Sequence, residues 1–216
     1  MDRRCLMTEN RTRLYLMTPP RLDATTFTDI LGEVLDSGDV ACVQLRLKDT
    51  SSDEIQRAAE LLGPVVQDRD VAFIMNDHPR LARECGCDGV HIEQEDTTYD
   101  DARIAIGPNG IVGVTCHASR HLAVEAGERG ADYVTFGDFF HTPARDSRAK
   151  AETELLEWWS DVTTVPCVAM GGITVENCLP LVTAGADFIA VAGGVWDHEQ
   201  GPAAAVRAFN KILDEN

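Results

Sequence analysis

The chain has 216 residues, of which 44% are hydrophobic and 25% are charged, and 36 acidic against 19 basic residues give a formal net charge of −17. This size predicts one α/β domain over residues 1–216, and so acidic a chain argues against binding to nucleic acid or to anionic membranes, which requires basic surfaces. Seven scattered cysteines, with no signal peptide and no apolar span of about 18 residues, predict a cytoplasmic protein.

Short apolar runs alternate with segments of helical spacing along the whole chain. The runs predict strands at residues 14–18, 41–48, 74–77, 89–96, 111–116, 133–137, 166–170 and 188–192. The segments between and after them predict helices at residues 26–37, 52–62, 79–84, 97–107, 119–128, 152–159, from 174 onwards and 203–213. Strands and helices that alternate eight times predict a (β/α)₈ TIM barrel. A doubly wound open sheet is the alternative, but no Gly-x-Gly-x-x-Gly follows the first strand.

The stretch from residue 74 to residue 96 contains the clearest functional signal. A helix that begins at Pro79 connects its two strands, and a crossover of this kind makes them parallel. Asp77 and Asp96 then lie at the same carboxyl-terminal edge, where ligands bind in parallel α/β folds. Two carboxylates at that edge predict a divalent-cation site, although a strand that simply turns polar at the surface would explain either residue alone.

Polar residues alternate with apolar ones in the second predicted strand. Gln44, Arg46 and Lys48 share one face, because side chains of a strand alternate between its two faces. The outer face of a barrel packs against helices, so we expect the polar face to point inward near the mouth. The forked guanidinium of Arg and the compact charge of Lys both suit phosphate oxygens.

The longest predicted loop, residues 138–150, is basic in a chain that is otherwise acidic. It contains Arg145, Arg148 and Lys150 at the edge where ligands bind. Its length is typical of a mobile cover, and its charge indicates an anionic substrate. Ordinary solvated loop residues are the alternative interpretation.

Glycine pairs follow the last two predicted strands. Gly171-Gly172 comes after the seventh strand and Gly193-Gly194 after the eighth, where barrels bind phosphate on backbone N–H groups. One such pair is equally suited to a simple turn, but two pairs in successive loops favour a phosphate site.

Two polar residues end the fifth predicted strand, Thr115 and His117. A histidine at this edge is a candidate for catalysis. A structural hydrogen bond is the commoner role of a single histidine, and both interpretations stay open.

Taken together, these motifs resemble the thiamine phosphate synthase family. The matching segments run in family order over nearly the whole chain: Gln44-x-Arg46-x-Lys48, Asn76-Asp77, Asp88-Gly89-Val90-His91-Ile92-x-Gln94-Glu95-Asp96, Gly113-Val114-Thr115-x-His117, Gly130-Ala131-Asp132-Tyr133-Val134, Phe140-x-Thr142-Pro143 and Gly171-Gly172-Ile173. The resemblance implies a (β/α)₈ barrel that joins hydroxymethylpyrimidine diphosphate to a thiazole phosphate and releases pyrophosphate, with Mg²⁺ as cofactor. It also implies small phosphorylated substrates and a homodimer.

The resemblance assigns roles to residues by their position in these motifs. The residues that would hold the pyrimidine diphosphate are Gln44, Arg46, Lys48 and Asn76, with Thr115 in place of the usual Ser and Arg145 in place of the usual Lys. Asp77 and Asp96 would hold Mg²⁺ between its phosphates. The residues that would meet the thiazole phosphate are Thr142, Val168, Gly172, Ala192 and Gly193. Charge on the leaving pyrophosphate would be neutralised by Mg²⁺, Arg46, Lys48 and Arg145, and Thr115 would offer the diphosphate a hydroxyl. Arg46, Lys48, Thr115 and Arg145 are thus the candidate catalytic residues.

The chain departs from the family pattern at Glu93, Asp138, Ala144 and Arg145, where the family usually has Gly, Pro, Thr and Lys. The departures between residues 138 and 145 bring the loop nearer to the related thiazole tautomerases, which use the histidine equivalent to His117. Those relatives generally lack the acids at Asp77 and Asp96, so a metal-dependent synthase is favoured. A non-catalytic barrel that binds a thiamine precursor is the third hypothesis.

Overall fold

A computed structural model describes the chain over residues 11–93, 97–141 and 150–216. Its strands are β1 (Arg13–Met17), β2 (Cys42–Leu45), β3 (Ala72–Asn76), β4 (Gly89–Glu93), β5 (Ile111–His117), β6 (Tyr133–Phe136), β7 (Cys167–Met170) and β8 (Phe188–Val191). They form one closed barrel in which each strand is parallel to its sequence neighbours and β8 pairs with β1. The predicted (β/α)₈ barrel is confirmed.

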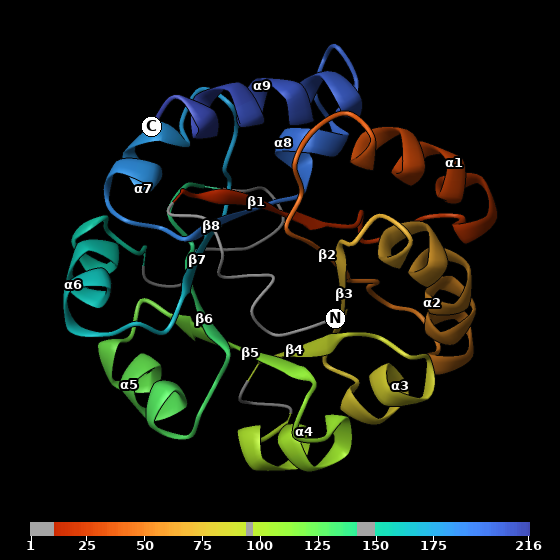
Figure 1. Ribbon diagram of the computed structural model, residues 1–216, viewed down its shortest axis with the longest axis horizontal. Coiled ribbons are helices and arrows are strands. Elements are labelled where there is room, and N and C mark those ends of the chain that lie inside the picture. The colour runs from red at the N-terminus through yellow and green to blue at the C-terminus, as the bar shows by residue number, and fades with distance from the viewer. Residues whose placement is uncertain (1–10, 94–96, 142–149) are drawn as a thin grey trace.

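The helices form a ring around the strands (Figure 1). Within the described residues they are α1 (Ala24–Leu35), α2 (Ser52–Gln67), α3 (Pro79–Glu84), α4 (Tyr99–Ile106), α5 (Arg120–Glu128), α6 (Glu154–Val162), α7 (Leu179–Thr183), α8 (Gly193–Trp196) and α9 (Pro202–Asp214). Several begin at a capping side chain, because the first N–H groups of a helix lack partners within it. Ser51 and Glu54 form a reciprocal capping box on α2, and the Thr98 side chain caps α4.

Several predicted elements differ from those of the structure. The second strand ends at Leu45 and not at Lys48, because the chain turns outward and the Arg46 N–H bonds to the Thr18 hydroxyl at 3.0 Å. The seventh helix begins at Leu179 and not at Thr174, whose N–H is held in a turn by the Asn177 side chain at 2.8 Å. The eighth β–α unit also contains an extra short helix, α8, ahead of α9.

Apolar side chains fill two layers of the barrel. Val43 and Leu45 belong to the outer layer between the strands and the helices, and Gln44 points into the interior beside Tyr15. The inner layer is a second cluster of buried side chains inside the barrel, which includes Ile74, Ile111, Val168 and Phe188. The alternation along β2 therefore has the predicted sense, with apolar residues outward and the polar residue inward.

A repeated Gly-x-Asp segment connects the amino-terminal ends of the strands. The three glycines precede β4, β6 and β8 with φ of 68°, 93° and 90°, a conformation that glycine adopts without strain: Gly86, Gly130 and Gly185. Each aspartate accepts a backbone N–H bond of 2.8 Å from the preceding odd-numbered strand: Asp88 from Phe73, Asp132 from Val112 and Asp187 from Cys167. The same hydrogen bond thus links β3 with β4, β5 with β6 and β7 with β8 at the amino-terminal end of the barrel, which we call its floor.

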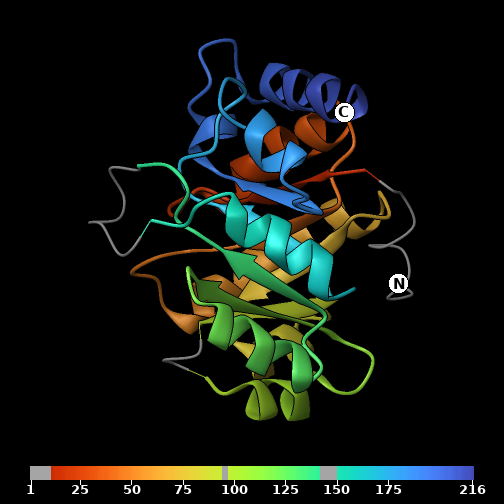
Figure 2. The same ribbon diagram turned by 90° about the vertical axis from the view of Figure 1, so that its left-hand side faces the viewer.

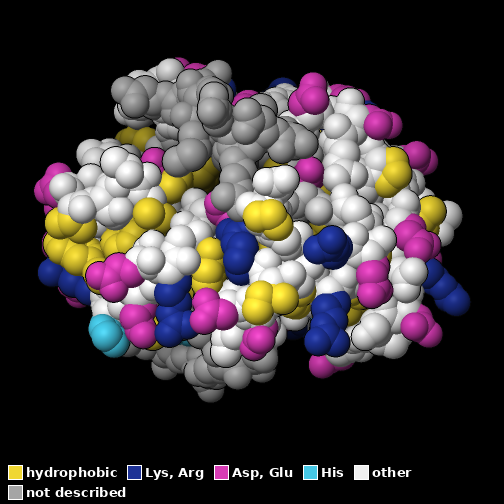
Figure 3. Space-filling model, turned by 60° about the horizontal axis from the view of Figure 1, so that its bottom comes forward, with side chains coloured by type: hydrophobic (Ala, Val, Ile, Leu, Met, Phe, Trp, Pro, Cys, Tyr) yellow, Lys and Arg dark blue, Asp and Glu magenta, His cyan; other side chains and the backbone are white. Residues whose placement is uncertain are grey.

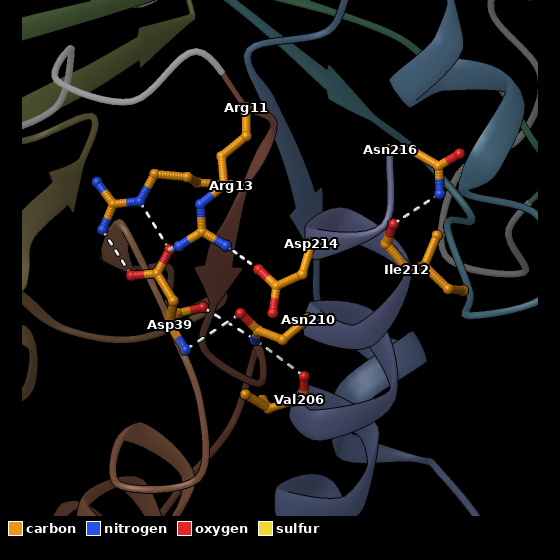
Figure 4. Close-up of polar contacts among 8 residues, drawn as sticks. All are labelled: Arg11, Arg13, Asp39, Val206, Asn210, Ile212, Asp214 and Asn216. Atoms are coloured by element: carbon orange, nitrogen blue, oxygen red, sulfur yellow. Dashed lines mark hydrogen bonds and ion pairs between the residues drawn. The ribbon is translucent and has the colours of Figure 1, made fainter.

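The ends of the described chain are joined at the same floor. Arg13 donates two hydrogen bonds to the Asp39 carboxylate, at 2.8 and 2.7 Å, which hold the pKa of that carboxyl below its usual value. The Asn210 side chain on α9 accepts from the Asp39 N–H at 3.2 Å and donates to its carbonyl at 3.1 Å (Figure 4). These contacts fasten α9 beside α1, as Figures 1 and 2 show from two directions.

On the face shown in Figure 3, charges of both signs lie close together in spite of the large negative total. On the face in Figure 3, acidic side chains are interspersed with Lys and Arg and do not form one continuous field. Within the described residues, none of the helices combines the length and the apolar character needed to cross a membrane.

Candidate active site

A pocket opens at the centre of the barrel, at the carboxyl ends of the strands. Its lining comes from every strand or the residue just beyond it: Tyr15, Met17, Gln44, Arg46, Asn76, His91, Glu93, Thr115, Thr135, Val168, Met170 and Ala190. Active sites of TIM-barrel enzymes lie at this end, because the side chains of many strands converge there. Five of the predicted substrate-binding or catalytic residues line this pocket: Gln44, Arg46, Asn76, Thr115 and Val168.

The residues of the second strand and the loop after it differ in exposure. Gln44 is only 3% exposed, Arg46 is half-buried at the pocket wall and Lys48 is exposed. The Lys48 N–H bonds to the Pro20 carbonyl at 2.9 Å, which fixes the start of its flexible side chain beside the mouth. Exposure to solvent therefore increases from the buried amide of Gln44 through Arg46 to the charged side chain of Lys48.

Asp77 follows β3 in a left-handed conformation with φ of 57°. Its N–H continues the pairing with β4 through the His91 carbonyl at 2.8 Å. Its carboxylate accepts the Glu93 N–H at 3.0 Å and a hydrogen bond from the Asn76 amide. Strained backbone of this kind is common at functional sites, and here it holds one half-buried carboxylate beside the pocket.

Buried polar side chains form a continuous chain across the interior, which we call the interior hydrogen-bond chain. Its contacts are Thr115 Oγ1 to His91 Nε2 (2.8 Å), His91 Nδ1 to Tyr133 OH (3.0 Å), Tyr133 OH to Tyr15 OH (2.9 Å), Tyr15 OH to Gln44 Oε1 (3.3 Å) and Gln44 Nε2 to Asn76 Oδ1 (2.5 Å). The chain ends where Asn76 donates to Asp77. It links strands on opposite sides of the barrel through side chains alone.

The Gly-Gly pair after β7 has a packing role. A Cβ on Gly171 would lie 2.7 Å from Asp138, and a Cβ on Gly172 would lie 2.8 Å from the His141 carbonyl. Both glycines also have positive φ, 102° and 63°. The segment after β6 runs along this turn, with the Phe140 N–H bonded to the Gly171 carbonyl at 3.0 Å. Close approach of the backbone thus explains these glycines without a ligand.

The second glycine pair forms the first half of α8. A Cβ on Gly194 would lie 2.3 Å from the Ile173 carbonyl, so this glycine lets α8 pack on the β7–α7 loop. Trp196 at the end of α8 donates from its indole N–H to the Met17 carbonyl at 2.6 Å. A short extra helix after the eighth strand is the element from which TIM barrels often build a phosphate site.

Comparison with known proteins decides the family. A family model described as thiamine monophosphate synthase matches residues 14–195. The chain belongs to this family. A thiamine-phosphate synthase of Rhodospirillum centenum is 60% identical over 201 residues, which cover 93% of this chain and 97% of that protein. One of Hyphomonas neptunium is 50% identical over 209 residues, covering 94% and 95%.

A solved structure supports the same relationship. Thiamine phosphate pyrophosphorylase from Pyrococcus furiosus matches with a TM-score of 0.83 and 28% sequence identity, covering 99% of this chain and 98% of that one. The thiamine monophosphate synthase family was therefore identified correctly from the motifs, and its barrel extends over the described chain.

Several residues predicted from the resemblance to thiamine monophosphate synthases lie away from the pocket lining or cannot be located. Lys48, Asp77, Gly172 and Ala192 lie on the segments that follow their strands, and Gly193 begins helix α8. Asp96, Thr142 and Arg145 lie outside the described residues, so the pairing of Asp77 with Asp96 stays a prediction. His117 ends β5 with φ of 51°, half-buried beyond the residues that line the pocket.

Sequence reasoning missed seven residues that line the pocket: Tyr15, Met17, His91, Glu93, Thr135, Met170 and Ala190. One signal was available for two of them. Gly89, His91 and Glu93 alternate with Val90 and Ile92 in the same way as the polar face of the second strand. The pattern indicates that His91 and Glu93 point inward.

The described residues fit a Mg²⁺ ion that is shared with a phosphorylated ligand. Within residues 11–93, 97–141 and 150–216, no three His, Cys, Asp or Glu side chains come together as a complete metal cage. Mg²⁺ is usually bound by one or two carboxylates, several waters and substrate phosphates. The Asp77 carboxylate next to a pocket that Arg46 lines matches that donor set.

Proposed function

We propose that this protein is a Mg²⁺-dependent transferase that joins hydroxymethylpyrimidine diphosphate to thiazole phosphate and forms thiamine phosphate and pyrophosphate. The observation that carries the proposal is the pocket lined by Gln44, Arg46 and Asn76, with the Asp77 carboxylate beside it. Family membership restricts the chemistry, and this pocket supplies groups for both halves of the first substrate: amides for a heteroaromatic ring and cations for a diphosphate.

The pyrimidine diphosphate would lie with its ring inward and its phosphates toward the loops. Gln44 and Asn76 are uncharged and largely buried, and they suit ring nitrogens and an exocyclic amine. Arg46 and Lys48 lie progressively closer to solvent, where a diphosphate can keep part of its hydration. Arg145 is proposed as a third cation on the loop after β6. Thr115, whose hydroxyl bonds to His91 Nε2, is proposed to lie beside the diphosphate.

Asp77, with Asp96, would hold Mg²⁺ at the same edge. When bound, Mg²⁺ would neutralise negative charge on the pyrophosphate as it leaves. The Asn76 amide and the Glu93 N–H orient the Asp77 carboxylate toward this task, because each occupies one of its oxygens.

The reaction requires no base from the protein. The bond between the methylene carbon and the diphosphate oxygen breaks, and its electron pair leaves with the pyrophosphate. The lone pair of the thiazole nitrogen then forms the new carbon–nitrogen bond, and that nitrogen has no proton to lose. Arg46 and Lys48 would stabilise the negative charge that develops on the leaving pyrophosphate. Stabilisation of developing charge by fixed polar groups is usually the largest single contribution to catalysis.

The thiazole phosphate would enter from the β7 and β8 side of the mouth. Val168 is 1% exposed and forms an apolar wall of the pocket. Thr142, Gly172, Ala192 and Gly193 are proposed to meet its phosphate, with backbone N–H groups at the start of α8. Gly172 then serves both packing and binding, since its lack of a side chain leaves its N–H accessible.

The test is a two-substrate assay with purified protein, hydroxymethylpyrimidine diphosphate, thiazole phosphate and Mg²⁺, with a chelated control. We expect stoichiometric thiamine phosphate and pyrophosphate that disappear on chelation. Folded protein that binds the diphosphate without forming product would refute the transferase, and the thiazole tautomerase reaction with a His117→Ala variant would be assayed next. The proposal includes a cytoplasmic homodimer, which analytical ultracentrifugation and cell fractionation would test.

A further inference from the structure

The interior hydrogen-bond chain is unusual for a barrel interior, which is normally filled by branched apolar side chains. Five of its members, on five different strands, are at most 5% exposed: Tyr15, Gln44, His91, Thr115 and Tyr133. Buried polar groups are costly unless each has a partner, and these groups supply partners to one another. The chain connects the pocket floor to the pocket walls, so its arrangement determines which atoms face a ligand.

The direction of the chain follows from a single charge. The Asp77 carboxylate only accepts hydrogen bonds, so Asn76 must present its NH₂ group to it. The Asn76 oxygen therefore faces Gln44, which donates from Nε2. The Gln44 oxygen is then turned to the interior, where the Tyr15 hydroxyl donates to it. One carboxylate thus fixes the orientation of two amides.

The direction continues beyond Gln44. Tyr15 uses its only proton on Gln44, so its oxygen accepts from the Tyr133 hydroxyl. Tyr133 in turn accepts from His91, which puts the proton of a neutral imidazole on Nδ1 and leaves Nε2 to accept from Thr115. Burial raises the pKa of both tyrosines well above the usual value, so both hydroxyls keep the protons that the chain requires.

We propose that Tyr15, Tyr133 and His91 are positioning residues that hold the Gln44 amide, oriented by Asn76, as a hydrogen-bond donor toward the ligand, an inference that rests on the proposed function. With its oxygen held by Tyr15 and one N–H used on Asn76, Gln44 has a second Nε2–H to present at the mouth. A ring nitrogen of an aminopyrimidine accepts such a bond. The buried tyrosines therefore select a ring with an acceptor nitrogen without touching it.

Each tyrosine supports a different part of the chain. Removing the Tyr15 hydroxyl leaves the Gln44 oxygen without its donor, so the amide is held only at Nε2 by Asn76 and is less firmly placed. Removing the Tyr133 hydroxyl leaves the bond between Tyr15 and Gln44 in place and releases His91 and Thr115 instead. The effect on ring binding is therefore larger for Tyr15→Phe than for Tyr133→Phe.

The experiment measures the Kd of hydroxymethylpyrimidine diphosphate by calorimetry and the KM of both substrates in the full-length variants. We expect Tyr15→Phe to weaken diphosphate binding about five- to tenfold, the effect of one lost hydrogen bond, with the KM of the thiazole phosphate unchanged. Tyr99→Phe is the matched control, because the Tyr99 hydroxyl also has two partners, the Gly130 carbonyl at 2.7 Å and Arg103 Nε at 3.1 Å, and it does not line the pocket. It should leave both KM values at the wild-type level.

A double-mutant cycle separates positioning from general loosening. If Tyr15 acts through Gln44, Tyr15→Phe should change the Kd in the wild-type background and have no further effect in a Gln44→Ala background. An equal factor in both backgrounds, or a folded Tyr15→Phe with wild-type Kd, would overturn the inference. If Tyr15→Phe does not fold, the cycle is run with Tyr133→Phe. It should change the Kd by a smaller factor that again disappears in the Gln44→Ala background, and an equal factor in both backgrounds would overturn the inference.

The outcome also distinguishes this inference from the proposed function. Wild-type protein that binds the diphosphate but forms no thiamine phosphate refutes the transferase, while the ratios of Kd still decide the role of the tyrosines. Wild-type protein that does not bind the diphosphate refutes both.

Discussion

Substitutions at Asp77 separate its structural contribution from its proposed role at the metal. In Asp77→Ala the Glu93 N–H and the Asn76 amide lose their acceptor, at about 1 kcal/mol each. Alanine at a φ of 57° costs about 1–2 kcal/mol more. We therefore expect the free energy of unfolding to fall by about 3–4 kcal/mol.

Asp77→Asn is the sharper test. Asparagine tolerates the left-handed conformation and keeps one oxygen for the Glu93 N–H, so its free energy of unfolding should fall by only about 1 kcal/mol. Because the charge is gone, its rate at saturating Mg²⁺ should still fall at least about 100-fold. Urea denaturation gives the free energies, and initial rates over a Mg²⁺ titration give the activity.

Two results would refute this reasoning. An Asp77→Asn variant with the wild-type rate would show that the carboxylate charge has no role in the reaction. An Asp77→Ala variant as stable as Asp77→Asn would show that the two hydrogen bonds and the backbone strain do not matter to the fold.

Three further predictions concern the floor and interior of the barrel. Asp132→Asn should lower the free energy of unfolding by about 3 kcal/mol, because it breaks a largely buried ion pair with Arg103. Asp187→Asn should lower it by less than about 1 kcal/mol, because burial already raises the pKa of Asp187 and disfavours its charged form. Equal losses for the two variants in urea denaturation would contradict this. Because the pKa of Asp39 is lowered in the folded protein, its contribution to stability is present above the unfolded pKa of about 3.9 and is lost as the pH falls through the lower folded pKa. Asp39→Asn should therefore weaken the fall in the free energy of unfolding at acid pH. An unchanged fall would argue against this. Gly113→Ala should lower the free energy of unfolding by about 1–3 kcal/mol and weaken diphosphate binding, because the new Cβ would lie 1.9 Å from the Tyr133 ring. A variant with the wild-type Tm and Kd would contradict the described packing of the interior.

The fold could be predicted because hydrophobic periodicity and crossover geometry leave few alternatives. Eight apolar runs separated by helical segments determine a closed parallel barrel, and the alternation of Gln44 and Arg46 with Val43 and Leu45 determines which face points inward. The short helix α8 could not be predicted, because four residues that begin with Gly-Gly have no helical period.

The interior hydrogen-bond chain could not be found from the sequence. Tyr15 and Tyr133 lie 118 residues apart on strands that are not neighbours, and only the closed barrel brings their hydroxyls to 2.9 Å. Similarly, Gly172 suggested a phosphate site in the sequence, whereas its contact with the loop after β6 depends on three-dimensional packing. Local patterns therefore predicted which residues reach the mouth, but not how they interact across it.

A crystal structure with pyrophosphate and Mn²⁺ in place of Mg²⁺ would test the central claim most directly. We predict an anomalous peak within bonding distance of an Asp77 carboxylate oxygen, with the pyrophosphate contacting Arg46. A peak elsewhere, or pyrophosphate bound away from the barrel mouth, would contradict this account of the site.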